Sequence, residues 1–254
     1  MDATFRIPRM FRGSLGKLAM KKNKRRTTVR RWHIALPLAA ACALSAAGAR
    51  AAGHFDVDDA GTLDAGQCQY ETWWGRTGTE PVNGFHFGPA CRVGPVELGL
   101  NFDRLSVQGE RSATVGPQLK WNFFGQAADA PLSAAVSVSA VFDATHGGRA
   151  GGQFVVPVTW RATQSLQLHA NLGADWATGT GQRTPRTGVA AEWALNDTVS
   201  LIAERNRAGG VWTSRVGARI SLTPLISVDV STSRTGPDGT RGFVIGLNHE
   251  FTWK

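Results

Sequence analysis

The stretch LQLHANLGADWA, residues 166–177, decides the fold class of this chain. Apolar residues recur at every second position, and the positions between them are mostly polar or small. This period of two is expected of a β-strand with one apolar face. The apolar positions are Leu166, Leu168, Ala170, Leu172, Ala174 and Trp176. The last segment repeats the pattern with Phe243, Ile245, Leu247, Phe251 and Trp253.

The same alternation recurs throughout the chain after residue 66, and helical periodicity is almost absent, so the fold class is all-β. The predicted strands are residues 67–75, 84–93, 96–105, 114–124, 132–143, 153–161, 166–177, 186–195, 199–206, 211–222, 226–234 and 242–253. Short turns alternate with longer, Gly-rich polar loops. This layout predicts a single transmembrane antiparallel β-barrel of about 12 strands over residues 67–254. Pro89, Pro117 and Pro157 lie inside predicted strands and are expected to mark bulges or changes of phase.

A soluble β-sandwich or a lipocalin-like barrel would also show alternating strands. The tryptophans favour the membrane barrel, because they sort by height into the two aromatic girdles expected at membrane interfaces. The predicted girdle at the loop end holds Trp74, Trp176 and Trp212, and the one at the turn end holds Trp121, Trp160, Trp193, Phe251 and Trp253. Trp73 is the exception, since it falls in the polar phase of its strand.

Residues 1–51 are predicted to be an N-terminal extension and a cleaved signal peptide. Met20–Arg31 is rich in basic residues, and an apolar stretch follows over Ile34–Ala47. Ala49-Arg50-Ala51 then fits the pattern of a signal-peptidase cleavage site. This layout predicts export by the general secretory route, and with the barrel it predicts the outer membrane of a Gram-negative cell. The leader also carries the chain's excess of positive charge: residues 1–51 hold +11, and the remainder holds −2. The folded part therefore lacks the basic footprint of a nucleic-acid-binding protein.

Residues 52–66 are expected to form a solvated periplasmic lead-in. Asp56, Asp58 and Asp59 offer oxygen ligands for Ca²⁺, but the run has no closing Glu, so no metal site is predicted. Cys68 and Cys91 fall in the apolar phase at the periplasmic ends of the first two strands. Adjacent antiparallel strands can bring such residues within disulfide distance.

Charged residues occupy the polar phase, which in a membrane barrel must face the lumen. The candidates for a selectivity surface are Glu71, Glu97, Lys120, His169, Glu192, Glu204, Arg215, Arg219 and Asp229. Two interpretations stay open: the charges line a narrow polar pore, or they pair with one another and fill the interior. Small residues in the same phase, including Gly188, Gly217 and Gly246, leave space and favour a passage.

A family resemblance rests on VDDAGT at Val57–Thr62, followed by GQCQYET at Gly66–Thr72. This opening resembles the start of outer-membrane proteins grouped under the meta-pathway of phenol degradation, many of which are called transporter-like. The resemblance implies an outer-membrane location and a role in uptake of small apolar or aromatic compounds. In that family the opening leads into a first strand with a buried Glu, which corresponds to Glu71 here. The resemblance supplies no well-defined binding residues.

We therefore expect a passive channel or uptake protein for small molecules, with no catalytic residue and no cofactor. The alternatives are a lipid-modifying enzyme resembling lipase or deacylase barrels, and a plugged structural barrel. His249 is the one His in the apolar phase, and it lacks the neighbouring Ser and acid that such an enzyme needs. The expected partners are outer-membrane lipid, a small solute, and the barrel-assembly machinery through the aromatic C-terminal strand. Nucleic acid is not expected as a partner.

Overall fold

The computed structural model describes residues 54–78, 82–127 and 129–253, so the predicted signal peptide lies outside the described residues. The strands are β1 (Gln67–Thr77), β2 (Val82–Val93), β3 (Val96–Val107), β4 (Glu110–Phe124), β5 (Leu132–Asp143), β6 (Arg149–Arg161), β7 (Leu166–Ala177), β8 (Arg183–Ala194), β9 (Val199–Ala208), β10 (Val211–Thr223), β11 (Ile226–Thr235) and β12 (Thr240–Thr252). The described residues contain no helix that is long and apolar enough to cross a bilayer.

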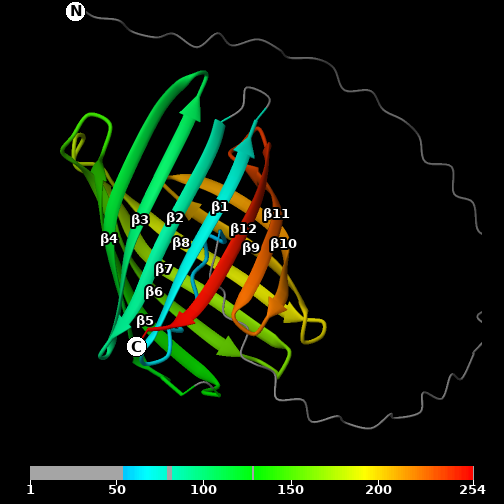
Figure 1. The fold of residues 1–254 in the computed structure, drawn as a ribbon. Coiled ribbons are helices and arrows are strands. Elements are labelled where there is room, and N and C mark those ends of the chain that lie inside the picture. Colours follow the sequence, from blue (N-terminus) through cyan, green and yellow to red (C-terminus); the bar gives the residue numbers. More distant parts are fainter. Residues whose placement is uncertain (1–53, 79–81, 128, 254) are drawn as a thin grey trace, which may run out of the picture. The chain divides into compact units, whose positions relative to one another are not determined.

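The strands close into one antiparallel barrel in chain order. Each strand pairs with its neighbours in sequence, and β1 pairs with β12 as well as with β2 (Figure 1). Closure leaves no unpaired sheet edge, which is the condition for strands to cross a lipid bilayer. The predicted all-β barrel is confirmed.

Several strands extend further toward the loop end than the apolar alternation predicts. β4 begins at Glu110 instead of residue 114, β6 at Arg149 instead of 153, and β8 at Arg183 instead of 186. These added residues are mostly polar or charged. Backbone pairing continues in the hairpin beyond the last apolar side chain, so the hydrophobic pattern ends before the strand does.

The three strand prolines do not behave as expected. Pro117 pairs with Leu100, and Pro157 pairs with Asn171, with no shift in register. The β2–β3 register is also the same on both sides of Pro89. The expectation of bulges or phase changes at these prolines is therefore wrong. The register shifts lie elsewhere, for example between Asn122 and Phe124.

The outer wall is apolar, and the core of the molecule lies inside the barrel. Large hydrophobic side chains in the outward phase are exposed, including Leu172 at 66% and Val216 at 57%. A continuous apolar exterior of this extent is stable only against hydrocarbon. Of the predicted girdle, Trp74, Trp121, Trp160, Trp193, Trp212, Phe251 and Trp253 are exposed on this wall. Trp176 is half-buried, because its indole lies over Gly152 of the neighbouring strand.

Cys68 and Cys91 form a disulfide between β1 and β2. They are direct partners in the strand register, close to the ends of the strands where β12 also finishes. The bond therefore joins the first hairpin of the barrel near the point where the sheet closes.

Candidate functional site

The lumen is occupied by the residues that precede β1. Residues 54–63, which we call the lumen segment, run inside the barrel and leave it where β1 begins (Figure 1). Val57 is 1% exposed, Ala60 is fully buried and Leu63 is 2% exposed. The expectation of a solvated lead-in over residues 52–66 is therefore wrong for residues 54–63, whereas residues 64–66 are exposed. The apolar side chains of this segment are buried in the barrel interior, where they are surrounded by polar side chains of the wall.

Carboxylates on the wall hold the backbone of the lumen segment at both of its ends. Glu204 on β9 accepts a hydrogen bond from the N–H of Val57 at 2.9 Å, and Glu97 on β3 accepts one from the N–H of Leu63 at 2.9 Å. The segment has no strand partner, so its backbone groups need partners from side chains. Two of the predicted lumen residues satisfy that need.

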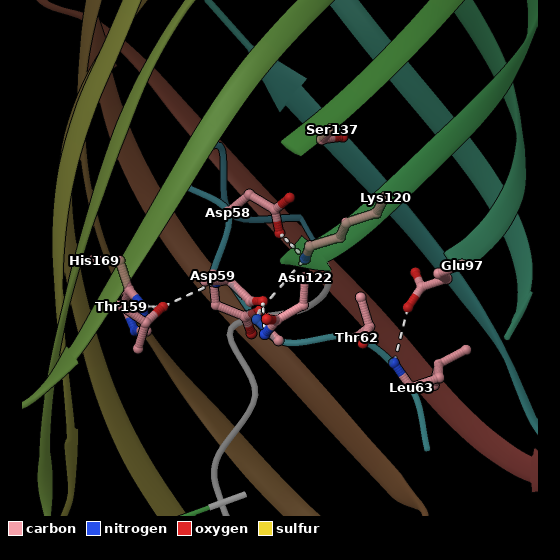
Figure 2. Close-up of polar contacts among 12 residues, drawn as sticks. Asp58, Asp59, Thr62, Leu63, Glu97, Lys120, Asn122, Ser137, Thr159 and His169 are labelled. Carbon is pink, nitrogen blue, oxygen red and sulfur yellow. Dashed lines mark hydrogen bonds and ion pairs between the residues drawn. The ribbon is translucent and has the colours of Figure 1, made fainter. Parts of the chain in front are cut away.

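A neutral contact holds the middle of the segment. The N–H of Ala60 donates to Thr159 Oγ1 at 2.9 Å, and its carbonyl accepts from Asn122 Nδ2 at 2.8 Å. Thr159 Oγ1 also lies 2.9 Å from His169 Nδ1, so His169 positions the hydroxyl from the neighbouring strand (Figure 2). His169 thus acts on the segment through Thr159.

Lys120 on β4 is shared by two carboxylates of the segment. Its Nζ lies 2.9 Å from Asp58 Oδ1 and 3.4 Å from Asp59 Oδ1 (Figure 2). Burial raises the pKa of Asp58 to about 6, against the opposing attraction of Lys120. Burial would also raise the pKa of Asp59, but the charge of Lys120 outweighs it and holds the pKa of Asp59 below its ordinary value. At neutral pH the two carboxylates and the ammonium form an ion triad with one net negative charge.

Arg215 on β10 is the second cation that binds the segment. Its Nη2 lies 2.8 Å from Asp56 Oδ2, its Nη1 donates to the carbonyl of His54 at 2.9 Å, and its Nε lies 3.0 Å from Glu204 Oε1. Asn206 Nδ2 also donates to Asp56 Oδ2 at 3.0 Å. Arg215 and Glu204 therefore bind the segment together, and they also form an ion pair with each other.

His54 is buried and neutral at the point where the described segment begins. Its Nε2 lies 2.6 Å from Ser231 Oγ. Burial, followed by the charge of Arg215, lowers the pKa of His54 to about 4.

Glycines in the wall make room for the segment. A Cβ placed on Gly188 would lie 2.7 Å from Val57 Cγ2, and one placed on Gly246 would lie 3.2 Å from His54 Nδ1. From the sequence, these small inward-facing positions are predicted to leave space for a passage. The structure fills that space with the chain's own residues.

Other predicted lumen residues pair within the wall. Arg219 on β10 binds Asp229 on β11 through Nε at 2.8 Å and Nη2 at 3.0 Å, and Asn248 Nδ2 donates to the same carboxylate at 2.9 Å. Glu192 on β8 is 1% exposed, next to Ile202 in the register. These residues fill the interior beside the segment.

Glu71 belongs to a separate cluster around His86. His86 Nδ1 lies 2.7 Å from Asp103 Oδ1, and Nε2 lies 3.4 Å from Glu71 Oε1. The ring of Trp73 stacks on His86 with centroids 5.2 Å apart. This explains why Trp73 stands out of phase with the girdles: it faces inward.

A cavity of about 340 Å³ remains at the loop end of the lumen. It is lined by polar inward residues of β3 to β8, including Asn101, Asp103, Gln153, Asp175 and Arg186. Arg186 Nε lies 2.7 Å from Asp175 Oδ1. None of the residues that line this cavity belongs to the lumen segment, so it is interior space available to a solute.

Sequence reasoning missed the lumen segment, although a signal was present. Phe55, Val57 and Leu63 are apolar residues placed among aspartates. Apolar residues at these positions indicate burial and are not expected in a solvated linker. The acidic run also matches Lys120 and Arg215, two cations of the predicted lumen. Among the described residues, no cluster of His, Cys, Asp or Glu could hold a metal ion. His249, considered for an enzyme site, has its Nδ1 3.1 Å from the hydroxyl of Tyr70.

Two solved porin structures are similar to this barrel in fold. The KdgM porin superposes with a TM-score of 0.59 at 8% identity, covering 72% of this chain and 99% of its own. The NanC porin superposes with a TM-score of 0.52 at 11% identity, covering 73% of this chain and 99% of its own. At this identity the likeness shows the fold. No curated protein matches the chain.

The match to a sequence family covers most of the chain and does not carry the phenol-degradation description, so that part of the resemblance is not confirmed. The model described as "Uncharacterised conserved protein UCP029691" matches residues 39–239, and the chain belongs to this family.

Proposed function

We propose that the protein is an outer-membrane channel for small polar molecules, narrowed by its own lumen segment. The observation that carries the proposal is the nature of the bonds that hold residues 54–63. They include ion pairs and hydrogen bonds to Lys120, Arg215, Glu204 and Glu97. Water can replace such contacts, so the segment can shift while the wall stays closed.

The charge of the lumen favours neutral or cationic solutes. In the inward phase of the described strands, the acids outnumber the bases. The acids are Glu71, Glu97, Asp103, Glu110, Asp143, Asp175, Glu192, Glu204, Asp229 and Glu250, and the bases are Arg92, Lys120, Arg161, Arg186, Arg215 and Arg219. The lumen segment adds further aspartates. An acidic lining concentrates cations and repels anions.

This lining differs from what the names of similar structures suggest. One of them is a KdgM porin in complex with oligogalacturonate, which is an acidic sugar polymer. The apolar or aromatic solutes implied by the sequence resemblance also fit poorly, because the inward face is polar. Fold likeness alone therefore does not transfer a solute to this chain.

The location follows from the same physical features. An apolar outer wall requires lipid, and a closed antiparallel barrel is the form that crosses outer membranes. β1 begins and β12 finishes at the same end of the barrel, and we assign that end to the periplasm. The opposite end, toward which β4, β6 and β8 extend beyond the predicted strands, then faces outward.

Planar-bilayer recording of the purified full-length mature protein tests the proposal. We expect small, cation-selective conductance steps, and larger steps from a variant that lacks residues 54–63. If neither protein conducts, the channel proposal fails. If the same preparation cleaves acyl chains from phospholipid or lipopolysaccharide, an enzyme is identified in its place.

A further inference from the structure

Charge on the outer wall is distributed in a way that a channel does not require. In the outward phase of the described strands, the carboxylates are absent and the charged side chains are arginines. These arginines are Arg76, Arg104, Arg111, Arg183, Arg205, Arg207, Arg234 and Arg241, and all lie near the loop end. Charged side chains facing lipid are costly unless they reach a polar partner. The arginines therefore indicate an anionic partner at the level of the outer headgroups.

The arginines are most concentrated on four neighbouring strands. Arg205 on β9 and Arg234 on β11 are both register partners of Ser214 on β10, and Arg234 is in turn the partner of Arg241 on β12. Like charges directly opposite each other on adjacent strands repel. An anion that bridges Arg234 and Arg241 would turn this repulsion into attraction.

Arg205 is already oriented for such a role. Its Nη1 donates to Ser214 Oγ at 2.9 Å, and its guanidinium lies 4.9 Å from the ring centre of Trp212. Stacking on an indole fixes the guanidinium plane while leaving donors available. The guanidinium fork matches the oxygens of a phosphate.

An apolar groove in the outer wall begins at these arginines. Arg205, Arg234 and Arg241 line one end of a hollow of about 1020 Å³, whose floor includes Ala191, Ala203 and Val216. A second hollow of about 1000 Å³ shares those three residues and extends to Trp193. The two hollows adjoin and form one groove, since Ala191, Ala203, Val216 and Thr232 line both of them. It leads from the cationic row toward the girdle at the turn end.

We propose that this groove binds a phosphorylated, acylated glycolipid of the outer leaflet, the lipopolysaccharide of a Gram-negative outer membrane. Its phosphates sit on Arg205, Arg234 and Arg241, and an acyl chain lies in the groove over Ala203. Charge complementarity selects this lipid over the phospholipid of the inner leaflet, because the outward arginines are confined to the loop end. The site is on the outside of the barrel and does not depend on whether the lumen conducts.

The test compares lipid retention by full-length mature protein in detergent, using native mass spectrometry. The probes are lipid A, dephosphorylated lipid A, phosphatidylcholine and inorganic phosphate. We expect the wild type to retain lipid A in preference to the other three. The double variant Arg234→Gln/Arg241→Gln should bind lipid A about ten-fold more weakly, because it loses charge-assisted hydrogen bonds.

Two further variants separate the site from general effects. Arg104→Gln/Arg111→Gln removes two outward arginines on β3 and β4, away from the groove, and should retain lipid A like the wild type. Ala203→Phe keeps all the arginines but fills the groove, and should weaken binding of lipid A. Equal retention of lipid A by the wild type and the Arg234→Gln/Arg241→Gln variant would overturn the proposal, as would equal binding of phosphatidylcholine or retention of inorganic phosphate alone.

Discussion

Lys120 on β4 lies 2.9 Å from Asp58, a residue 62 positions earlier in the chain that is not part of any strand. This contact ties the wall to the interior segment and makes the lumen a folded structure instead of an open tube. Several of the residues expected to select solutes also position this segment. Substitutions at these residues distinguish solute selection from positioning of the segment.

Lys120→Met should release the lumen segment locally. Removing one partner of a buried ion pair costs about 3–5 kcal/mol, because the remaining charges lose their compensation. We expect larger conductance steps and faster hydrogen exchange in residues 54–63. Arg186→Met is the matched control for hydrogen exchange, since Arg186 pairs with Asp175 away from the segment. Adding Asp58→Asn and Asp59→Asn to Lys120→Met should restore the segment in part. Failure of that rescue would argue against charge compensation.

Gly188→Val should displace the segment by sterics alone. The added side chain would meet Val57, since even a Cβ at this position would lie 2.7 Å from Val57 Cγ2. We expect greater hydrogen exchange of residues 54–63 with the barrel intact. Gly179→Val is the control, because a Cβ there has nothing within 4 Å. Unchanged exchange in Gly188→Val would mean that the segment adapts without leaving the lumen.

Arg215→Ala and Glu204→Ala should shift ion selectivity in opposite directions. Loss of Arg215 leaves the lumen more negative, and loss of Glu204 leaves it less negative. The reversal potential under a salt gradient measures both. Because both residues also hold the segment, conductance is expected to rise in each variant. A shift of the same sign in both would show that segment release, and not charge, sets selectivity.

Acid should loosen the segment through His54. The pKa of His54 is about 4 when buried and 6.5 when exposed to water, so the docked segment excludes a proton that the released segment takes up. The stabilisation is complete above pH 6.5 and is lost as the pH falls toward about 4. Arg215 and Arg219 favour the neutral ring, whereas Asp229 and Asp56 oppose them.

Asp58 acts in the opposite direction between pH 3.8 and about 6, because its pKa is raised on burial. The informative comparison is therefore between the wild type and His54→Gln. The opening equilibrium of the segment, obtained from hydrogen exchange after correction for the intrinsic pH dependence of amide exchange, should increase more in the wild type between pH 7 and pH 5. An equal rise in both proteins would exclude His54 as the cause.

Removing the disulfide should destabilise the barrel without opening it. Cys68 and Cys91 are 23 residues apart, and a crosslink closing a loop of that size contributes about 3 kcal/mol. Cys68→Ser/Cys91→Ser should unfold at a lower urea concentration in detergent, with unchanged single-channel conductance. A changed conductance would place the bond in the lumen architecture.

The barrel could be predicted from the sequence because strand alternation is a local signal. Residues 166–177 show it fully, and the structure forms β7 with the same bounds. Where the residues become polar, as at Glu110, the strand continues because its backbone still pairs with the neighbouring strand. Backbone pairing produces no hydrophobic pattern in the sequence, so these residues could not be predicted as strand. The lumen segment was beyond local reasoning, since its place depends on partners far along the chain. Val57 contacts Glu204, at a separation of 147 residues.

The lumen segment has a consequence for how the molecule assembles. Its partners lie on β3, β4, β6, β9, β10 and β11, on strands from both halves of the chain. The pairing of β1 with β12 therefore closes the barrel around a segment that is bound by strands from both halves of the chain. The lumen segment can act as an internal template, which holds early and late hairpins together before β1 and β12 pair.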